Sequence, residues 1–595
     1  MRRERLRDYA ILLAASAALT LPNLGATSLW DVDEGVNAEA AREMRDNGTW
    51  VIPTFNYQLR TAKPVMLYWL QRGTYTAFGV SEWSARLPSV LAAWLTVLLT
   101  YELARGMFGR TTGLLAGVVL ASAVEFCVLA HAATPDATLL LFTVLTYRLF
   151  WSRHENGARV WWVPTAAACG LAVLTKGPVG LALPGLVILT YFAWNRELGR
   201  LLDRKLWWAV LTFALVAGPW YGLVTAETRG VWAGTFFGRE NLQRFTTPME
   251  NHRGPVLYHA AALLVLFTPW SAFLLGAVWY GLKATRREEP NPPTPFPKKE
   301  GGAGPSAVLS PSPRPGPREA PLTGPGSKEG GVGEGASPRP YRFLICWFAA
   351  YLVFFSAAAT KLPNYMLPVY PALAILTARF LVRWRAGDLT LPRWMMPAAV
   401  AGVVVTAVAV FGGLLVAGDA VQVLPAGSRV FPGLERWAVL AAVPLAAAVV
   451  MARAVRANDR ARFVRAMTVG AVTFTALAAA FPSLSVDEQK APKELVRLSG
   501  VDDPSRDIRL GHFDWFQPSL VFYARRELVE VFSPDKAAEF LAVPTPGYLF
   551  VPAKTWEQVE PKLAVPTRIV ARHRDFYRNC DILVVTNEVT VTAGR

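Results

Sequence analysis

Two polar stretches near the start of the chain read WDVDEGVNAEAAREMR at residues 30–45 and RTAKPVMLYWLQR at residues 60–72. Together they form the only long polar segment in the first half of a chain that otherwise consists of apolar runs. Those runs are about as long as a membrane is thick. We therefore expect this segment to lie outside the lipid and to carry the chemistry.

The first stretch holds three carboxylates within four residues: Asp31, Asp33 and Glu34. Asp33 is a candidate N-cap of a short helix, and Gly48 is a candidate stop. In the second stretch, Pro64 suits the first position of another short helix, and Lys63 precedes it. A cation beside a positive helix end can hold a phosphate. The alternative is a solvated cap of acidic residues with Lys63 reaching the membrane interface.

The composition predicts a polytopic membrane protein. Hydrophobic residues make up 53% of 595 residues, with 21 Trp, 31 Phe and a mean hydropathy of +0.27. The formal charge of +17 comes from Arg and Lys in short links between apolar runs, the pattern of the positive-inside rule, so we do not expect nucleic-acid binding. Four scattered cysteines exclude a zinc cluster or disulfide framework.

Apolar runs of spanning length predict about thirteen transmembrane helices. They lie near 9–24, 86–104, 111–130, 136–151, 160–175, 178–194, 206–225, 256–282, 342–358, 366–382, 394–417, 436–452 and 466–482. The first is interpreted as a retained span. Arg-rich links place the N-terminus in the cytoplasm, and an odd number of spans places the C-terminus outside. The first outward loop is 25–85, and Asp136, Lys176, Arg253 and Lys361 reach the same outer surface.

Two segments differ from the membrane part, residues 1–482. Residues 286–340 are rich in Pro, Gly and Ser and predict a disordered cytoplasmic insertion. Residues 483–595 are mixed in composition and predict an extracytoplasmic α/β domain. We expect a helix at 493–498 and strands at 508–511, 528–532, 548–552 and 582–586.

A set of short motifs resembles the aminoarabinose transferase (ArnT) branch of the protein-mannosyltransferase-like, family 39 class of bacterial membrane glycosyltransferases. The motifs are DEG at 33–35, AE at 38–39, REM at 42–44, KP at 63–64, YWL at 68–70, PD at 135–136, KGP at 176–178, FF at 236–237, RF at 244–245, KLPNY at 361–365 and LP at 367–368, with Asn241, His252, Arg253 and Pro255.

The resemblance implies a GT-C fold, amphipathic helices at the outer face of the bacterial inner membrane, and a sugar donor carried on a polyprenyl phosphate. The two essential aspartates of the family correspond to Asp33 and Asp136. The family lysine that binds the donor phosphate corresponds to Lys63. The chain departs from the family pattern at Val36 and Asn37, so donor sugar and acceptor stay open.

Transfer to a hydroxyl needs a carboxylate base, for which Asp33, Asp136 and Glu34 are the candidates. The leaving phosphate needs cations or hydrogen-bond donors, and we add Arg253, Lys361 and Tyr365 to Lys63 for this role. Alternatives remain open. Asp136 could be a helix N-cap, and Lys176 is interpreted as an interfacial anchor. Three residues are candidates for a divalent metal site: Glu34, Glu240 and His252.

We therefore predict a membrane glycosyltransferase, a hexosyl- or pentosyltransferase, that uses a polyprenyl-phosphate sugar. Its acceptor is lipid A, another glycolipid, a glycan or a protein. The competing hypothesis is a transporter or flippase of lipid-linked sugars, but such proteins usually carry polar or broken helices at mid-membrane.

Overall fold

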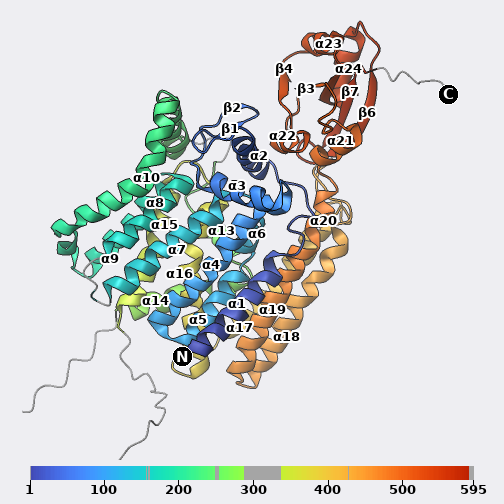
Figure 1. Ribbon diagram of the computed structural model, residues 1–595. Coiled ribbons are helices and arrows are strands. Elements are labelled where there is room, and N and C mark those ends of the chain that lie inside the picture. Colours follow the sequence, from blue (N-terminus) through green and yellow to red (C-terminus); the bar gives the residue numbers. More distant parts are fainter. Residues whose placement is uncertain are drawn as a thin grey trace, which may run out of the picture.

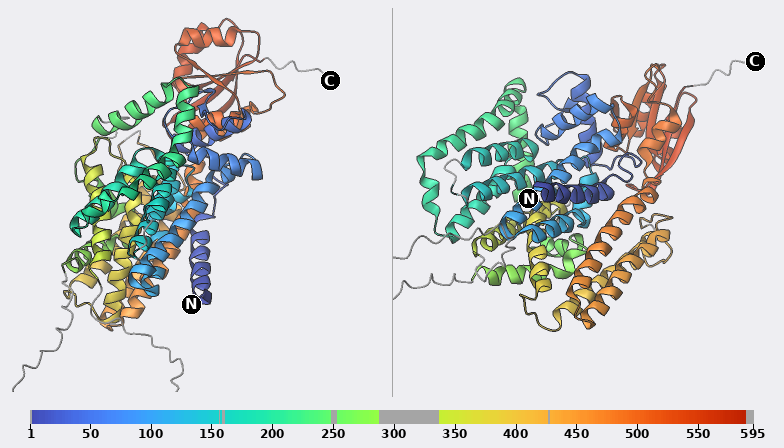
Figure 2. Two further views of the ribbon diagram at one scale, coloured as in Figure 1. Left: turned by 60° about the vertical axis from the view of Figure 1, so that its left-hand side comes forward. Right: turned by 60° about the horizontal axis from the view of Figure 1, so that its bottom comes forward.

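The computed structural model describes residues 2–155, 157, 161–247, 253–286, 337–425 and 428–588. Most of the predicted insertion at 286–340 lies outside these residues, as does His252. A bundle of long helices carries a smaller mixed α/β domain at one end, called here the upper end after its place in Figure 1. The N-terminus lies at the lower end of the bundle, as the left view of Figure 2 also shows.

Seven described helical spans are long and apolar enough to cross a membrane, or nine when each of two bent pairs counts as one. The seven are α4 (Glu82–Phe108), α10 (Trp207–Glu227), α15 (Arg339–Ala357), η5 with α16 (Pro363–Val369, Tyr370–Ala386), η6 with α18 (Glu435–Ala441, Ala442–Arg456), α17 (Met395–Ala417), and α19 with α20 (Arg460–Ala480, Pro482–Asp487). The bent pairs are α5 with α6 (Arg110–Ala121, Val124–His131) and α13 with η4 and α14 (Tyr258–Leu266, Trp270–Phe273, Leu274–Ala284).

Other predicted spans form helices that are shorter or more charged: α1 (Arg2–Thr20), α7 (Pro135–His154), α8 (Trp162–Lys176) and α9 (Val179–Trp194). A helix of 15 residues such as α8 is only about 22 Å long. The prediction of about thirteen spans therefore includes helices that are too short or too charged to be identified as membrane spans by length and composition alone. Between α10 and α13 lie α11 (Val231–Thr235), the π-helix η3 (Phe236–Gln243) and α12 (Arg244–Thr246).

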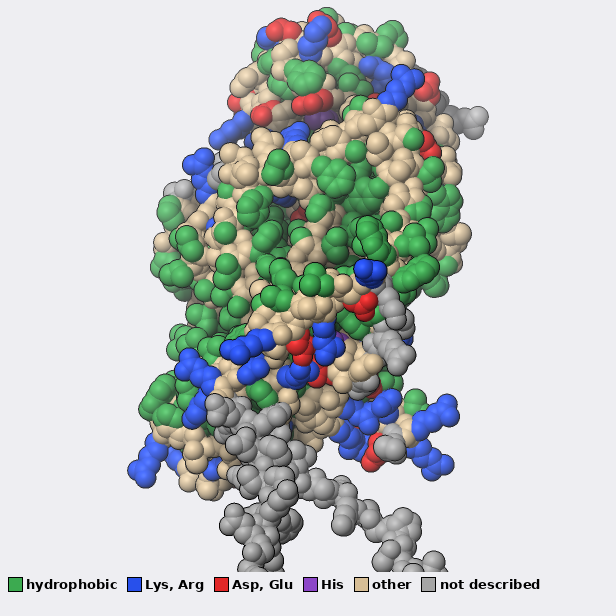
Figure 3. All heavy atoms as spheres, turned by 90° about the vertical axis from the view of Figure 1, so that its left-hand side faces the viewer, with side chains coloured by type: hydrophobic (Ala, Val, Ile, Leu, Met, Phe, Trp, Pro, Cys, Tyr) green, Lys and Arg blue, Asp and Glu red, His purple; other side chains and the backbone are tan. Residues whose placement is uncertain are grey.

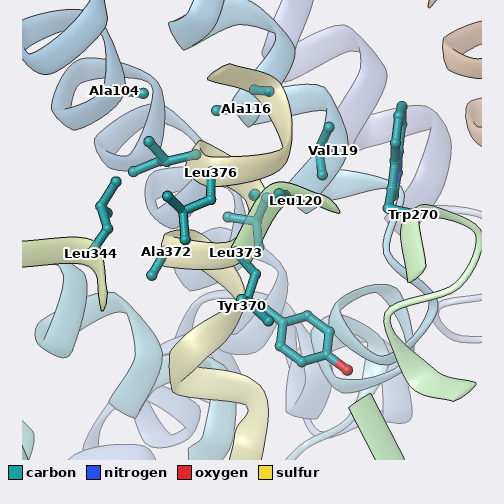
Figure 4. Packing of buried hydrophobic residues seen from close by; sticks show 14 of the residues in the cluster. Ala104, Ala116, Val119, Leu120, Trp270, Leu344, Tyr370, Ala372, Leu373 and Leu376 are labelled. Atoms are coloured by element: carbon teal, nitrogen blue, oxygen red, sulfur yellow. The ribbon is translucent and has the colours of Figure 1, made fainter. Parts of the chain in front are cut away.

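The central element of the bundle is α16, and 89% of the apolar window of η5 and α16 is buried, against 17% for α10 and for α17. Figure 4 shows its residues Tyr370, Leu373 and Leu376 packed beside Leu120 of α5 and Leu344 of α15. Hydrophobic side chains cover the middle of the face in Figure 3, with Lys and Arg gathered toward both ends. This distribution matches a surface that meets lipid at mid-height.

The polar stretches form two short helices at the upper end, α2 (Asp33–Asp46) and α3 (Met66–Phe78), joined by the hairpin of β1 (Thr54–Phe55) and β2 (Gln58–Leu59). Val32 is the N-cap of α2, so Asp33 is its first helical residue. Gly48 has a φ of +70° just beyond the helix, as expected of a stop. The second helix begins at Met66, two residues after Pro64.

The C-terminal part contains a five-stranded sheet of order β4-β3-β5-β7-β6, in which β3 is parallel to β4 and β5 and the other pairs are antiparallel. The strands are β3 (Arg509–Phe513), β4 (Leu528–Val531), β5 (Gly547–Pro552), β6 (Arg568–Asp575) and β7 (Cys580–Thr586). Its helices are α21 (Ala491–Ser499), α22 (Pro518–Ala524), α23 (Pro534–Ala542) and α24 (Ala553–Val559). In Figure 1, α22 faces α2.

Helices α8 and α9 pack through a glycine, which yields a test of the fold. A Cβ at Gly180 would lie 2.5 Å from the backbone carbon of Ala172. We expect Gly180→Ala to lower the thermal unfolding temperature of the purified protein, because overpacking costs about 1–3 kcal/mol. Gly185→Ala on the same helix is the control, since a Cβ there would have no neighbour within 4 Å. Equal unfolding temperatures for the two variants would contradict this packing.

Candidate active site

Asp33 begins α2 with an exposed side chain at the upper end of the bundle. In the described part of the chain it forms no hydrogen bond or ion pair. Its negative charge nevertheless acts on two ammonium groups, those of Lys63 and Lys176. Asp33 is therefore a carboxylate with free lone pairs beside two cations.

Lys63 lies between β2 and α3 and is half-buried. Its ammonium has no hydrogen-bond or ion-pair partner among the described residues. Burial is the main cause that lowers the pKa of Lys63 to about 8; the nearby charges of Lys176, Arg244 and Arg60 act in the same direction, while Asp33 opposes them. A poorly hydrated cation with no partner of its own is suited to bind an anion.

Asp136 is buried in the first turn of α7 and has two partners from distant helices. Lys176 Nζ, at the end of α8, donates to Asp136 Oδ1 over 2.6 Å, and Asn364 Nδ2 of η5 donates to the same oxygen over 3.3 Å. Thr134 is the N-cap residue of α7, so Asp136 is not merely a cap. Lys176 is paired inside the protein, which corrects its interpretation as an interfacial anchor.

Glu34 has a different environment from Asp33 and joins the elements that carry the site. Its carboxylate is buried and receives Arg86 Nε over 2.9 Å and Arg86 Nη2 over 2.8 Å. It also accepts from the backbone N–H of Ala133 over 2.6 Å and of Trp30 over 2.7 Å. The opposite charge of Arg86 and these hydrogen bonds hold the pKa of Glu34 below its usual range in spite of burial. Because both oxygens are occupied, the structure supports a positioning role in place of the predicted catalytic one.

The predicted metal ligands are not brought together among the residues that the structure describes. Within these residues, no group of three His, Cys, Asp or Glu side chains could hold a metal ion. Glu34 is paired with Arg86, and Glu240 lies 3.7 Å from Arg244 in an ion pair. His252 lies outside the described residues.

The remaining phosphate candidates separate into two groups. Lys361 Nζ donates to the carbonyl oxygens of Phe355 over 3.0 Å and Ser356 over 2.6 Å, so it caps the end of α15. This contact corrects the expectation that Lys361 binds the donor phosphate. Arg253 is exposed and makes no hydrogen bond or ion pair within the described ranges. Tyr365 lies in the site, with its ring centre 5.9 Å from Lys176 Nζ and a hydroxyl that has no described partner.

Sequence reasoning missed two cations of the site, Arg60 and Arg244, whose charges act on Lys63. Arg60 is held by Tyr68 Oη at 2.7 Å and by Asn37 Oδ1 at 3.2 Å. The RTAKP and RF stretches contain these arginines, but their spacing does not show that both lie close enough for their charges to act on Lys63. With Lys63 and Lys176 they make four cations, against the three carboxylates Asp33, Asp136 and Glu240, the last of which is paired with Arg244. The site therefore has an excess of positive charge that favours an anionic ligand.

The Glu34–Arg86 pair gives a test that separates positioning from catalysis. We expect Arg86→Ala to destabilise the protein by about 3–5 kcal/mol, because it leaves a buried carboxylate without its counter-charge. Thermal unfolding in detergent measures this loss. Glu34→Gln should lower the unfolding temperature as well, whereas a purely catalytic Glu34 would lose turnover at an unchanged unfolding temperature.

Part of the chain is similar in sequence to known proteins. Residues 62–221, which include Lys63, Asp136 and Lys176, match the family described as dolichyl-phosphate-mannose-protein mannosyltransferase. Two relatives are named undecaprenyl phosphate-alpha-4-amino-4-deoxy-L-arabinose arabinosyl transferase. The Erwinia tasmaniensis protein is 30% identical over 376 residues, and the second protein of that name from Proteus mirabilis is 29% identical over 377 residues. Each match covers 62% of this chain and 59% of the relative.

The fold matches solved structures over nearly its whole length. The crystal structure of ArnT from Cupriavidus metallidurans bound to undecaprenyl phosphate has a TM-score of 0.73 at 23% identity, with 99% of each chain covered. The apo structure of the same protein gives a TM-score of 0.72 with the same coverage. The chain is thus ArnT-like in sequence and has the GT-C fold, as its motifs predicted.

Proposed function

We propose that this protein is an integral membrane glycosyltransferase that moves a sugar from a polyprenyl-phosphate donor to a hydroxyl of an outward-facing acceptor. The observation that carries the proposal is that Asp33 and Lys63, a carboxylate and a half-buried cation without hydrogen-bond or ion-pair partners among the described residues, lie in one cluster of charges. A base for the acceptor and a cation for the leaving phosphate are the two groups that this reaction requires.

In the proposed step, the acceptor hydroxyl loses its proton to Asp33 while its oxygen forms a bond to the anomeric carbon of the sugar. The bond between that carbon and the phosphate oxygen breaks, and the electron pair leaves with the polyprenyl phosphate. Negative charge grows on the phosphate as the sugar becomes oxocarbenium-like. Lys63, Arg60 and Arg244 offset this charge.

Asp136 contributes through Lys176. The ion pair at 2.6 Å fixes the ammonium at the end of α8, beside Tyr365 and within the field of Asp33. Asn364 supports the same carboxylate oxygen from η5. Asp136 thereby joins three separate helical elements around the reaction centre. Tyr365 supplies a hydroxyl donor for the phosphate or the sugar.

The names of the relatives suggest which substrates to test first. Both describe an undecaprenyl-phosphate-linked aminoarabinose, which is a pentose, so we propose an undecaprenyl-phosphate pentose as donor. Lipid A or another glycolipid is the first acceptor to test, followed by glycans and proteins. We place the N-terminus in the cytoplasm of a bacterial cell, thirteen helices in the inner membrane, and residues 483–595 outside.

Asp33→Asn tests the base. We expect transfer to fall at least about 100-fold, because the amide cannot accept the proton. The unfolding temperature should stay unchanged, since Asp33 is exposed and has no described partner. Purified protein incubated with a panel of polyprenyl-phosphate sugars, followed by mass spectrometry, measures the products. Asp46→Asn at the other end of α2 is the control and should remain active. Wild-type turnover by Asp33→Asn would rule out this base.

The lowered pKa of Lys63 predicts that donor turnover depends on pH. Its lowered pKa means that the free enzyme loses this positive charge as pH rises through about 8, so kcat/KM for the donor should decline above that pH. Lys63→Arg should keep its charge and remove the decline, because an arginine stays protonated to about pH 12. Lys493→Arg, at a lysine of α21, should leave the decline in place. An identical decline in Lys63→Arg and wild type would exclude Lys63 as its source.

A further inference from the structure

Asp31 is a buried carboxylate for which the proposed reaction has no chemical use. It lies two residues before Asp33, and its side chain is 6% exposed. Asp31 Oδ1 accepts the backbone N–H of Ser519 over 2.7 Å, and Oδ2 accepts the hydroxyl of the same serine. Ser519 belongs to the first turn of α22 in the C-terminal domain. Two hydrogen bonds therefore connect Asp31, in the first outward loop, to a residue 488 positions away in the chain.

Gly35 shows how closely the two helices approach at this point. A Cβ on Gly35 would lie 2.4 Å from the backbone nitrogen of Ser519 and 2.8 Å from its Cα. Contacts this short with backbone atoms cannot be relieved by rotating a side chain. The first turn of α2 therefore rests directly on the first turn of α22, and the position requires glycine.

The residues just before α2 are held by the same part of the protein. Lys490 Nζ donates to the carbonyl of Ser28 over 3.0 Å. The backbone N–H of Leu29 donates to Tyr523 Oη over 2.7 Å, and that of Asp31 donates to Tyr577 Oη over 2.8 Å. The ring of Trp30 lies 5.4 Å from that of Phe576. Each residue from 28 to 31 thus contacts the segment that begins at Lys490.

Asp33 itself has no such anchor, since its side chain is exposed and unpartnered in the described ranges. Its position is set by the backbone of residues 28–35. We propose that the C-terminal domain places the catalytic carboxylate, with Asp31 and Ser519 as the positioning residues. This inference rests on the proposed function, and it assigns the domain a part in turnover without requiring it to bind substrate.

The chemistry of Asp31 indicates which substitution should be tolerated. Burial raises the pKa of Asp31 to about 7, and the two hydrogen bonds from Ser519 oppose the rise. Lys490 lowers this pKa and Asp575 raises it. A carboxyl that is easily protonated near neutral pH resembles an amide in shape and charge. Asp31→Asn should therefore keep the contact, with its amide oxygen accepting the Ser519 N–H and its amide nitrogen donating to the rotated Ser519 hydroxyl, whereas Asp31→Ala removes it.

Kinetics of the purified full-length protein test the proposal. We expect Asp31→Ala to lower kcat about 100-fold, because misplacement of a reacting group by about 1 Å has an effect of this size. Ser519→Ala should lower kcat less, about 10-fold, because it removes the hydroxyl bond and keeps the backbone N–H bond to Asp31 Oδ1. The donor KM should change less than about twofold, since Lys63 has no hydrogen bond or ion pair to residues 28–35 in the described part of the chain. The double variant should be no slower than Asp31→Ala alone, because Asp31→Ala already removes both hydrogen bonds from Ser519. Asp31→Asn should restore most of kcat.

Lys493→Ala is the matched control. It breaks a different ion pair between the C-terminal domain and the bundle, Lys493 to Glu82 at 2.6 Å, and should keep the wild-type kcat. Wild-type kcat in Asp31→Ala, a double variant slower than Asp31→Ala, or a loss in Lys493→Ala equal to that in Asp31→Ala would each overturn the positioning role.

Hydrogen exchange gives a readout that does not depend on activity. In Ser519→Ala, the amides of residues 28–37 should exchange faster than in wild type and in Lys493→Ala. If the amides of residues 28–37 exchange at the wild-type rate in Ser519→Ala, the proposal is overturned. An inactive wild-type protein with faster exchange in Ser519→Ala would refute the proposed function and leave the positioning contact standing.

Discussion

The buried ion pair between Glu34 and Arg86 is the contact on which the site depends. Arg86, near the start of α4, also donates to the carbonyls of Leu24, Thr27 and Ser28, so it binds the chain that leads into α2. Glu34 in turn accepts the N–H of Ala133, three residues before Asp136. One pair of opposite charges therefore connects the segment of Asp33 to the turn of Asp136. Inside a low-dielectric interior such a pair is stable only when its other hydrogen-bonding groups are satisfied, and here they are.

Much of the site could be predicted because membrane topology restricts where polar residues can lie. Asp33 and Lys63 belong to one outward loop, and the helices that follow return the chain so that the charge of Lys63 acts on Asp136. The roles of neighbouring residues were harder to predict. Asp33 and Glu34 have similar side chains, and the difference between a free carboxylate and a saturated one depends on Arg86 and Ala133. Likewise, Lys361 became a helix cap because α15 ends where its ammonium can reach two carbonyls.

The fold, like the site, could be predicted from the sequence in some parts and not in others. The helix at 493–498 and the strands near 508, 528, 548 and 582 were confirmed as α21, β3, β4, β5 and β7. Strand β6 was missed because half of RIVARHRD is charged and the strand is only partly buried at the sheet edge. Strand β6 is formed by its pairing with β7, and a pairing between two strands cannot be predicted from the local sequence of one of them. The count of spans was similarly limited, since buried helices such as α8 need less length and apolar character than a helix surrounded by lipid.

The contact between Asp31 and Ser519 has a consequence for biogenesis. A chain emerges from the ribosome with its N-terminus first, so α1 and the loop that follows it are made long before α22 exists. The partners of residues 28–31 become available only after the last helices have been inserted and the final domain has folded. Under the proposed positioning role, the candidate active site is completed only at the end of assembly, and a nascent or truncated chain lacks a centre competent for the proposed transfer.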